Sequence, residues 1–165
     1  MERMSAGEET LMAGIVVLTY DGSEDARRAI AVAGELLGGR PAVVVHVQIQ
    51  IPPPMIGAAP NGPSEDEVVE RYMEARSRRV LDEGVDLAAK AGFEPDGVNK
   101  IADGVSGVWH AIIEVAKERD AELIVVGHRG LSRIKSVLLG SVSNGVVNHS
   151  TVPVLTVPAT HGPAA

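Results

Sequence analysis

Three glycines and a group of basic side chains occur close together near the end of the sequence. Two residues separate Gly127 from Gly130, nine separate Gly130 from Gly140, and Ser141 follows directly. Glycine lets backbone amides approach a ligand without a β-carbon in the way. Gly140 and Ser141 also open a predicted helix, whose free amides and dipole favour an anion. The same stretch carries four basic or imidazole side chains, His128, Arg129, Arg133 and Lys135. The pattern predicts a polyphosphate site, and an ordinary surface loop is the alternative.

Other kinds of reactive site are not indicated. The glycines match neither GxxxxGK[ST] nor GxGxxG, which argues against the common triphosphatase and dehydrogenase motifs. No paired carboxylates lie next to the motif and no Ser-His-Asp order is supported by spacing, so no catalytic residue is expected. The chain has no cysteine, which excludes thiolate nucleophiles and cysteine-based metal sites. The histidines are too scattered for a zinc site, and a metal would be magnesium held by phosphates and water.

The composition favours one domain built on a parallel sheet. A chain of 165 residues can bury a single core of two or three layers. Of the residues, 45% are hydrophobic but only 2% are aromatic, so the core must consist of Val, Ile, Leu and Ala, as in parallel strands covered by helices. The net charge of -7 argues against general binding to nucleic acid. No apolar run approaches the length of a membrane span, so no membrane partner is expected and the cytoplasm is the default location.

Strands and helices are predicted in alternation, and they place the glycine motif. Strands are predicted at 14–20, 42–49, 96–102, 123–127 and 152–157, and helices at 23–37, 64–92, 106–119 and 141–149. This order implies a doubly wound α/β domain at 14–158, with helices on both faces of a parallel sheet. A flexible leader at 1–13 and a flexible tail at 159–165 are expected to flank it. Such sheets bind ligands beyond the carboxyl ends of strands, where Asp21 ends the first strand and Gly127 the fourth.

Local signals indicate where two of the helices begin. Ser23 is the predicted N-cap of the first helix, because carboxylates follow it in the first turn. Ser64 and Glu67 match a capping box for the long second helix. The proline-rich segment 51–63 precedes that helix and is interpreted as one long excursion, folded over a ligand or extended into solvent.

Several polar residues also have structural interpretations. His46 lies in an apolar strand and is interpreted as a hydrogen-bonded core residue. Asp21 can form a local turn bond ahead of a helix. A solvated helix face is the interpretation for three arginines, Arg76, Arg78 and Arg79.

The last predicted strand contains Pro153. Proline lacks an amide donor, so within sheets it is confined to edges. An exposed edge rich in Val, Leu and Thr promotes aggregation unless it is covered, and pairing with a twofold copy would cover it. The sequence therefore predicts a homodimer formed through Val152–Val157.

Four stretches of the sequence together resemble the universal stress protein family. They are the glycine motif, TYDGSEDARRAI at the end of the first strand, VVVHV in the second, and GSVSNGVVNHSTVPVLTV near the end of the chain. The resemblance covers about residues 14–158, and the glycine motif is similar to that of ATP-binding members. It implies a five-stranded parallel sheet of order 3-2-1-4-5, a symmetric homodimer, and an adenine nucleotide across the ends of the first and fourth strands.

The resemblance also implies a role for individual residues. Asp21 would lie beside the ribose and adenine, with Thr19 and Tyr20 leading into it. Val47 would contact the adenine through its backbone, and Val126 would lie under the nucleotide. The other positions would line the ribose and inner phosphates, namely Gly127 and Gly130, or the outer phosphates, namely Gly140, Ser141, Val142 and Ser143, with both serines donating hydroxyls. His128 and Arg129 complete the predicted site through their charge.

Three functions remain in competition. The first is a regulatory protein that binds ATP, or AMP or ADP, possibly with magnesium, and changes the surface that it shows to partners. The second is a slow magnesium-dependent ATPase, in which Ser141 and Ser143 only orient the nucleotide. The third is a structural dimer module that binds no nucleotide. The intact glycine motif favours the first.

Overall fold

The computed structural model describes residues 14–50, 65–128 and 139–158, which form one α/β domain. Its strands are β1 (Val16–Thr19), β2 (Pro41–Ile49), β3 (Glu94–Ala102), β4 (Leu123–Gly127) and β5 (Val154–Val157). Its helices are α2 (Glu24–Leu37), α3 (Glu65–Lys90), α4 (Gly104–Glu118) and α5 (Ser141–His149). All neighbouring strands pair in parallel, in the order β3-β2-β1-β4-β5. The predicted fold and strand order are confirmed.

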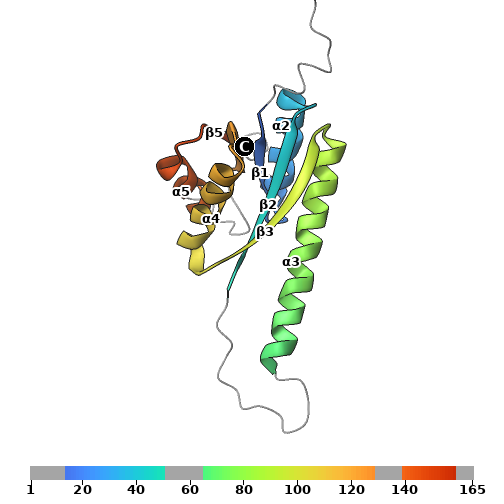
Figure 1. Ribbon diagram of the computed structural model, residues 1–165, viewed down its shortest axis with the longest axis vertical. Helices are drawn as coiled ribbons and strands as arrows, with labels where there is room; N and C mark the ends of the chain where they lie inside the picture. The colour runs from blue at the N-terminus through green and yellow to red at the C-terminus, as the bar shows by residue number, and fades with distance from the viewer. Residues whose placement is uncertain (1–13, 51–64, 129–138, 159–165) are drawn as a thin grey trace, which may run out of the picture.

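The sheet separates two apolar layers. Residues of the central strands alternate between them: Leu18 and Val44 pack with α2 and α3, whereas Val17 and Val45 pack with α4 and α5. Figure 1 shows the two pairs of helices on opposite sides of the sheet. The aliphatic side chains of β1 and β4 are almost completely buried, apart from half-buried Leu123, because parallel strands in this position are covered on both faces. The core therefore holds the carboxyl ends of these strands in fixed positions.

Several predicted boundaries are wrong by a few residues. β1 begins at Val16 instead of residue 14, β2 at Pro41 instead of residue 42, and β3 at Glu94 instead of residue 96. The β3 residues are mostly exposed or half-buried, so their sequence lacks the apolar pattern of a covered strand. α4 begins at Gly104, two residues before the predicted start, because Gly104 adopts a φ of 67° that turns the chain directly into the helix.

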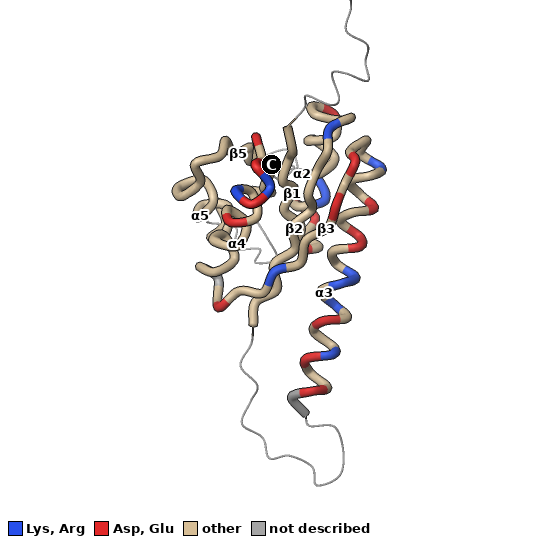
Figure 2. Tube along the Cα trace, in the orientation of Figure 1, with Lys and Arg blue, Asp and Glu red and all other residues tan. Residues whose placement is uncertain are grey.

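α3 is the longest helix, with 26 residues, and it runs past the end of the sheet (Figure 1). Acidic and basic residues follow one another along its length (Figure 2), as expected for a helix with a solvated face. Of the three arginines predicted on that face, all are exposed, and Arg78 pairs with Glu74 at 3.0 Å. Ser64 of the predicted capping box lies outside the described residues, as do the segments 1–13, 51–63 and 159–165. No helix in the described part of the chain has the length and apolarity needed to cross a bilayer.

β5 lies at one edge of the sheet, which confirms the position inferred for it. It is shorter than predicted, because Pro153 precedes the strand instead of lying within it. The Pro153 carbonyl accepts a hydrogen bond from the Ile124 amide at 2.9 Å, and the Val157 carbonyl accepts one from the His128 amide at 2.8 Å. Odd-numbered residues of β5 therefore bond to β4, so the backbone groups of Val154 and Thr156 point away from the sheet.

Candidate functional site

A cavity of about 520 Å³ lies at the carboxyl ends of β1, β2 and β4. β1 and the turn after it contribute Thr19, Tyr20 and Asp21, and β2 contributes residues 45–49. β4 and the start of α5 contribute Val126, Gly127 and residues 140–143, while α3 and α4 close the sides. The cavity thus lies where connections leave the sheet toward opposite faces, which is the usual ligand position in doubly wound folds.

The end of β1 is held on both sides. The Tyr20 amide donates to the Val45 carbonyl at 2.9 Å, and the Thr19 hydroxyl donates to the Val125 carbonyl at 3.1 Å. The Tyr20 side chain is 2% exposed and belongs to the core under α2 and α3. Thr19 and Tyr20 therefore fix the point from which Asp21 projects.

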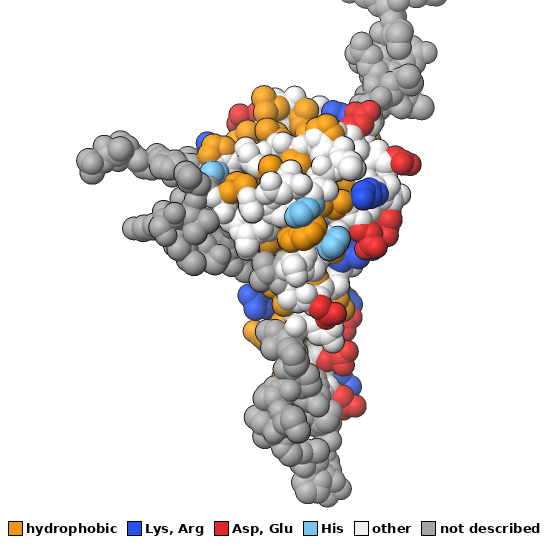
Figure 3. Space-filling model, turned by 90° about the vertical axis from the view of Figure 1, so that its left-hand side faces the viewer, with side chains coloured by type: hydrophobic (Ala, Val, Ile, Leu, Met, Phe, Trp, Pro, Cys, Tyr) orange, Lys and Arg blue, Asp and Glu red, His pale blue; other side chains and the backbone are white. Residues whose placement is uncertain are grey.

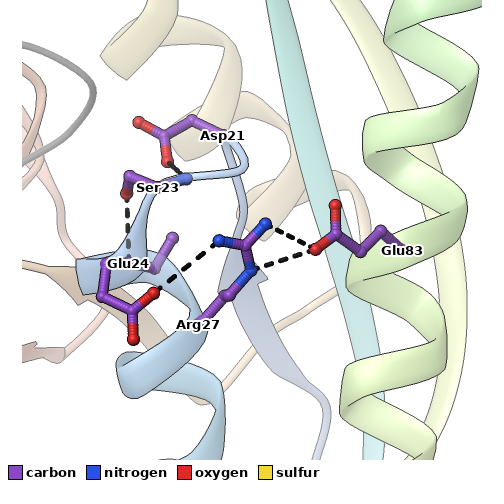
Figure 4. A network of polar contacts seen from close by, with 6 residues as sticks. Asp21, Ser23, Glu24, Arg27 and Glu83 are labelled. Atoms are coloured by element: carbon purple, nitrogen blue, oxygen red, sulfur yellow. Dashed lines mark hydrogen bonds and ion pairs between the residues drawn. The ribbon is translucent and has the colours of Figure 1, made fainter.

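Asp21 makes the local turn bond that the sequence offered as an alternative to a role in ligand binding. Its Oδ1 accepts a hydrogen bond from the Ser23 amide at 2.9 Å, and Ser23 Oγ accepts from the Ala26 amide at 3.2 Å (Figure 4). Ser23 is thus the N-cap of α2, as predicted. The turn bond engages one carboxylate oxygen of Asp21, and the other makes no hydrogen bond to the described residues of this cavity-lining site.

The packing of α2 against β4 requires a glycine at position 127, independently of any ligand. A β-carbon at this position would lie 2.9 Å from the carbonyl carbon of Asp25 and 3.2 Å from the Ala26 amide nitrogen. Real side chains do not approach backbone so closely, and a close-packed interior has no room to relax. The first turn of α2 therefore rests directly on the end of β4, which joins the Asp21 turn to the glycine motif.

The N-terminus of α5 opens onto the cavity, and none of the described residues caps it with a side chain. Gly140 is the N-cap residue, it offers no capping side chain, and no acidic residue occurs in the first turn. The Gly140 amide donates to the His128 carbonyl at 2.9 Å, which brings the two ends of the motif together. The next amides, of Ser141 and Val142, belong to the first turn of the helix, where amides have no partner within the helix itself. Such an end, with its dipole, binds anions.

Ser143 is buried, with 5% exposure, and its hydroxyl donates to the Gly127 carbonyl at 2.7 Å. A hydroxyl has a single proton to donate. Direct donation to a phosphate, expected from the resemblance, would require this bond to break. Ser143 thus ties the first turn of α5 to the end of β4, whereas Ser141 is exposed and its hydroxyl makes no hydrogen bond to the described residues.

The walls between these polar groups are apolar. Val126 forms the floor at the end of β4, Val47 lies on β2, and Val142 lies on α5. Val108 and Ile112 of α4 complete this side. The combination of an anion-binding end with a broad apolar surface suits a phosphorylated ring compound.

His46 is fixed within the cavity wall. Its Nδ1 lies 2.9 Å from the Tyr20 carbonyl oxygen. Burial lowers the pKa of His46, and Arg76 acts in the same direction, although the Tyr20 hydrogen bond and Asp21 oppose them. His46 is therefore hydrogen-bonded, as predicted, but it is half-buried instead of lying in the core, because it lines the cavity.

The helix α3 was missed as a source of site residues. Met73, Arg76, Ser77 and Val80 line the cavity, and the charge pattern had placed Arg76 only on a solvated face. No local motif marks these positions, because they reach the site through the packing of α3 across the sheet. Ser77 is 2% exposed and donates to Asn99 Oδ1 at 2.9 Å.

Part of the predicted site is not described. Arg129 and Gly130, together with Arg133 and Lys135, fall outside the described residues. His128 is described, and it does not line the cavity; both of its backbone groups are engaged in the hydrogen bonds given above. Within the described ranges no cluster of three potential metal ligands occurs.

The arrangement of these elements agrees with comparison to known proteins. The sequence profile of the universal stress protein family matches residues 12–158. The chain belongs to the universal stress protein family. A family member from Thermus aquaticus, the universal stress protein in the QAH/OAS sulfhydrylase 3' region, is 34% identical over 146 residues, which are 86% of this chain and 96% of that protein.

Two further relatives show how far the likeness extends. The universal stress protein YxiE of Bacillus subtilis is 40% identical over 79 residues, which are 48% of this chain and 51% of that protein. The match thus spans about half the length of that relative. A crystal structure of a universal stress protein in complex with cAMP is 26% identical, with a TM-score of 0.63, and covers 88% of this chain and 97% of that one. A homologue of this chain therefore binds an adenine nucleotide.

Proposed function

We propose that this universal stress protein binds an adenine nucleotide in the cavity and acts through occupancy of that cavity as a regulatory module. The observation that carries the proposal is the start of α5. Among the described residues no side chain caps its amides, no acidic residue occurs in its first turn, and the first turn opens onto the cavity at the end of β4. α2, by contrast, has a serine cap and two carboxylates in its first turn. The start of α5 suits the phosphates, since free amides and the positive helix end favour anions.

The rest of the cavity supports the nucleoside. Asp21 can accept hydrogen bonds from ribose hydroxyls, and the valines at the ends of β2 and β4 suit an aromatic base. The related structure in complex with cAMP supports adenine as the base. ATP, ADP and AMP share these features, and magnesium would be held by the phosphates and water.

The proposal assigns binding, with little or no turnover. Among the described residues that line the cavity, Asp21 is the one carboxylate, and one of its oxygens is already bonded to the Ser23 amide. A base that activates water must lie within hydrogen-bond reach of that water next to the γ-phosphate. Asp21 lies at the end of β1, whereas the anion site lies at the start of α5.

The proposal is tested by calorimetric titration of nucleotide-free protein with ATP, ADP and AMP. We expect saturable binding of at least one of them, and phosphate release from ATP that is negligible over hours. Acid extraction of freshly purified protein, followed by mass analysis, would identify any nucleotide that co-purifies. Failure of all three nucleotides to bind would overturn the proposal, and rapid phosphate release would overturn its regulatory part.

We also propose that a second copy pairs along β5. The outward backbone groups of Val154 and Thr156 have no strand beside them in the described chain, and uncovered edges are hazards that native proteins cover. Figure 3 shows the side of the molecule on which α5 lies. On it apolar side chains are scattered among uncharged atoms, and acidic side chains gather toward one margin. A surface with few charges at its centre is typical of an interface core.

A further inference from the structure

The cavity has a second side, which faces α3 and is separate from the valines that suit the nucleoside. Val45 and Val47 of β2 belong to the apolar layer under α4 and α5. The residues that alternate with them, His46 and Gln48, are therefore directed toward α3. Both of them line the cavity. The ends of β1 and β2 thus have cavity walls on both faces of the sheet.

The opposite wall on this second side is one stripe of α3 at helical spacing. The stripe lines the cavity with Met73, Arg76, Ser77 and Val80. Ser77 is 2% exposed and its hydroxyl donates to Asn99 of β3 at 2.9 Å, which fixes the stripe against the sheet. We call the part of the cavity lined by this stripe, His46 and Gln48 the α3 compartment.

Arg76 is a cation on the stripe that faces the sheet, where a helix normally carries apolar side chains. Met73 and Val80, one turn before and after it, are half-buried, whereas Arg76 is exposed and lines the cavity. None of the ion pairs between described residues includes Arg76. The pKa of His46 is lowered by burial and also by the charge of Arg76, so this charge acts at the wall of the compartment.

The groups around Arg76 indicate what the compartment can hold. Asp21, the one described carboxylate that lines the cavity, lies at the end of β1, and one of its oxygens accepts from the Ser23 amide. A guanidinium binds a carboxylate through two parallel hydrogen bonds, which are stronger than bonds between neutral groups. Met73 and Val80 add apolar surface on either side of this cation. A convergent charge within apolar walls is typical of a site for a small organic ligand.

We infer that the α3 compartment binds a carboxylate with a short apolar body, beside the nucleotide. The Arg76 guanidinium donates two hydrogen bonds to the carboxylate, and the apolar body packs against Met73 and Val80. The carboxylate belongs either to a separate small acid or to a substituent of the nucleotide itself. The second source rests on the proposed function, whereas the first does not.

The first experiment is an NMR titration of the 15N-labelled full chain with hexanoate, in the presence of saturating AMP. AMP keeps hexanoate away from the amides at the start of α5. We expect saturable shifts of the Arg76 Nε–H and of the backbone amides at 73–80. Arg76→Gln should weaken hexanoate binding about tenfold, because a charge-assisted contact is lost. Arg79→Gln is the matched control, since Arg79 is exposed on the same helix but does not line the cavity. It should leave the affinity unchanged.

The second experiment tests the nucleotide as the source of the carboxylate. Calorimetry compares AMP with the AMP derivative that carries a succinyl group on its 6-amino nitrogen. If the carboxylate belongs to the nucleotide, the derivative should bind about tenfold more tightly than AMP to the unaltered chain and to Arg79→Gln. This advantage should disappear in Arg76→Gln.

Either result supports a carboxylate in the α3 compartment and identifies its source. The inference is overturned if hexanoate binding does not depend on Arg76 and the succinyl derivative gains nothing from Arg76. Displacement of hexanoate by AMP would place the acid at the α5 amides, and it would exclude the separate acid. In these cases binding of AMP leaves the proposed function intact. If AMP does not bind, the proposed function fails, and the hexanoate titration without AMP still decides the inference through Arg76→Gln.

Discussion

At the level of the single residue, Gly127 has two roles: it belongs to the glycine motif, and the first turn of α2 packs against it. Gly127→Ala would force a methyl group against the backbone of Asp25 and Ala26, at 2.9 to 3.2 Å. We expect the free energy of unfolding to fall by about 1–3 kcal/mol, as in other overpacked sites. Urea denaturation measures the effect.

Gly140→Ala is the comparison for that change. Gly140 has φ of -62° and ψ of 156°, which any residue can adopt. Alanine there should cost less than at Gly127, about 0.5–1 kcal/mol, because glycine is preferred to alanine at an N-cap although neither offers a capping oxygen. Equal stability of the two variants would show that α2 does not press on Gly127 in solution. The stability of Gly127→Ala must therefore be measured before any loss of ligand binding in this variant is interpreted.

Tyr20 gives the chain a predictable response to alkaline pH. Its hydroxyl is buried and has no hydrogen-bond partner in the described residues, and burial, followed by the nearby Glu83, raises its pKa from 10.0 to about 12. Because the folded pKa is raised, the unfolded chain loses this proton first. Stability from this group is complete below pH 10 and is lost as the pH rises from 10 toward 12.

Tyr20→Phe should remove that part of the alkaline decline and should not lower stability at pH 7, since it deletes an unpaired buried hydroxyl. Tyr72→Phe is the matched control, because Tyr72 is 68% exposed. Urea midpoints between pH 9 and 11 would show the difference. Parallel curves for the two variants would contradict the prediction.

At the level of the element, a charge placed at the start of α5 should change nucleotide affinity and stability in opposite directions. Ser141→Glu adds a carboxylate in the first turn of a helix that has none. The helix dipole favours it, so we expect the free energy of unfolding to rise by about 0.3–1 kcal/mol. The same charge repels a phosphate at these amides, so nucleotide affinity should fall about tenfold or more.

Ser141→Gln controls for the length of the new side chain without the charge. Calorimetry and urea denaturation on the three proteins measure both effects. If Ser141→Glu bound AMP as tightly as Ser141→Gln, the phosphates would have to lie elsewhere, and the proposed site would be wrong at its anion end.

The elements also show what the sequence could and could not predict. The order of strands and helices and the cap at Ser23 were predicted correctly, because each depends on side chains within one turn or one strand. The start of β3 at Glu94 was missed, since its half-exposed residues lack an apolar pattern. The contact of Gly127 with Asp25 was missed because it joins residues about a hundred positions apart. Arg76 enters the site for a similar reason, through packing of α3 that no local pattern encodes.

At the level of the whole molecule, β5 is the edge at which a dimer can be tested without damage to the core. Val154 and Leu155 both pack against the chain's own apolar layers, so charged substitutions there would also destabilise the fold. Thr156 directs its backbone groups outward from the sheet. Thr156→Pro removes an outward N–H and no bond to β4, since proline is tolerated at an edge. We expect a dimer in sedimentation velocity for the unaltered chain and a monomer for Thr156→Pro.

Thr156→Ala keeps the N–H and should remain dimeric. Thermal unfolding by circular dichroism would establish that both variants are folded. A dimer that survives the proline would exclude pairing along β5, and a monomeric unaltered chain would exclude the dimer itself.

One hydrogen bond described above has a further consequence for how such a domain can diversify. The Gly140 amide bonds to the His128 carbonyl, so a backbone contact holds the start of α5 at the end of β4. The entropic cost of closing a loop grows only by about 0.6 kcal/mol for each doubling of its length. A change of length between these two residues therefore costs little in chain entropy, although it would move Gly130 out of the spacing of the predicted phosphate motif. Substitutions that keep this spacing should leave β4, α5 and the amides at the start of α5 where they are. Because of this one backbone contact, changes in the connecting segment can alter ligand binding without moving the strand and the helix that it joins.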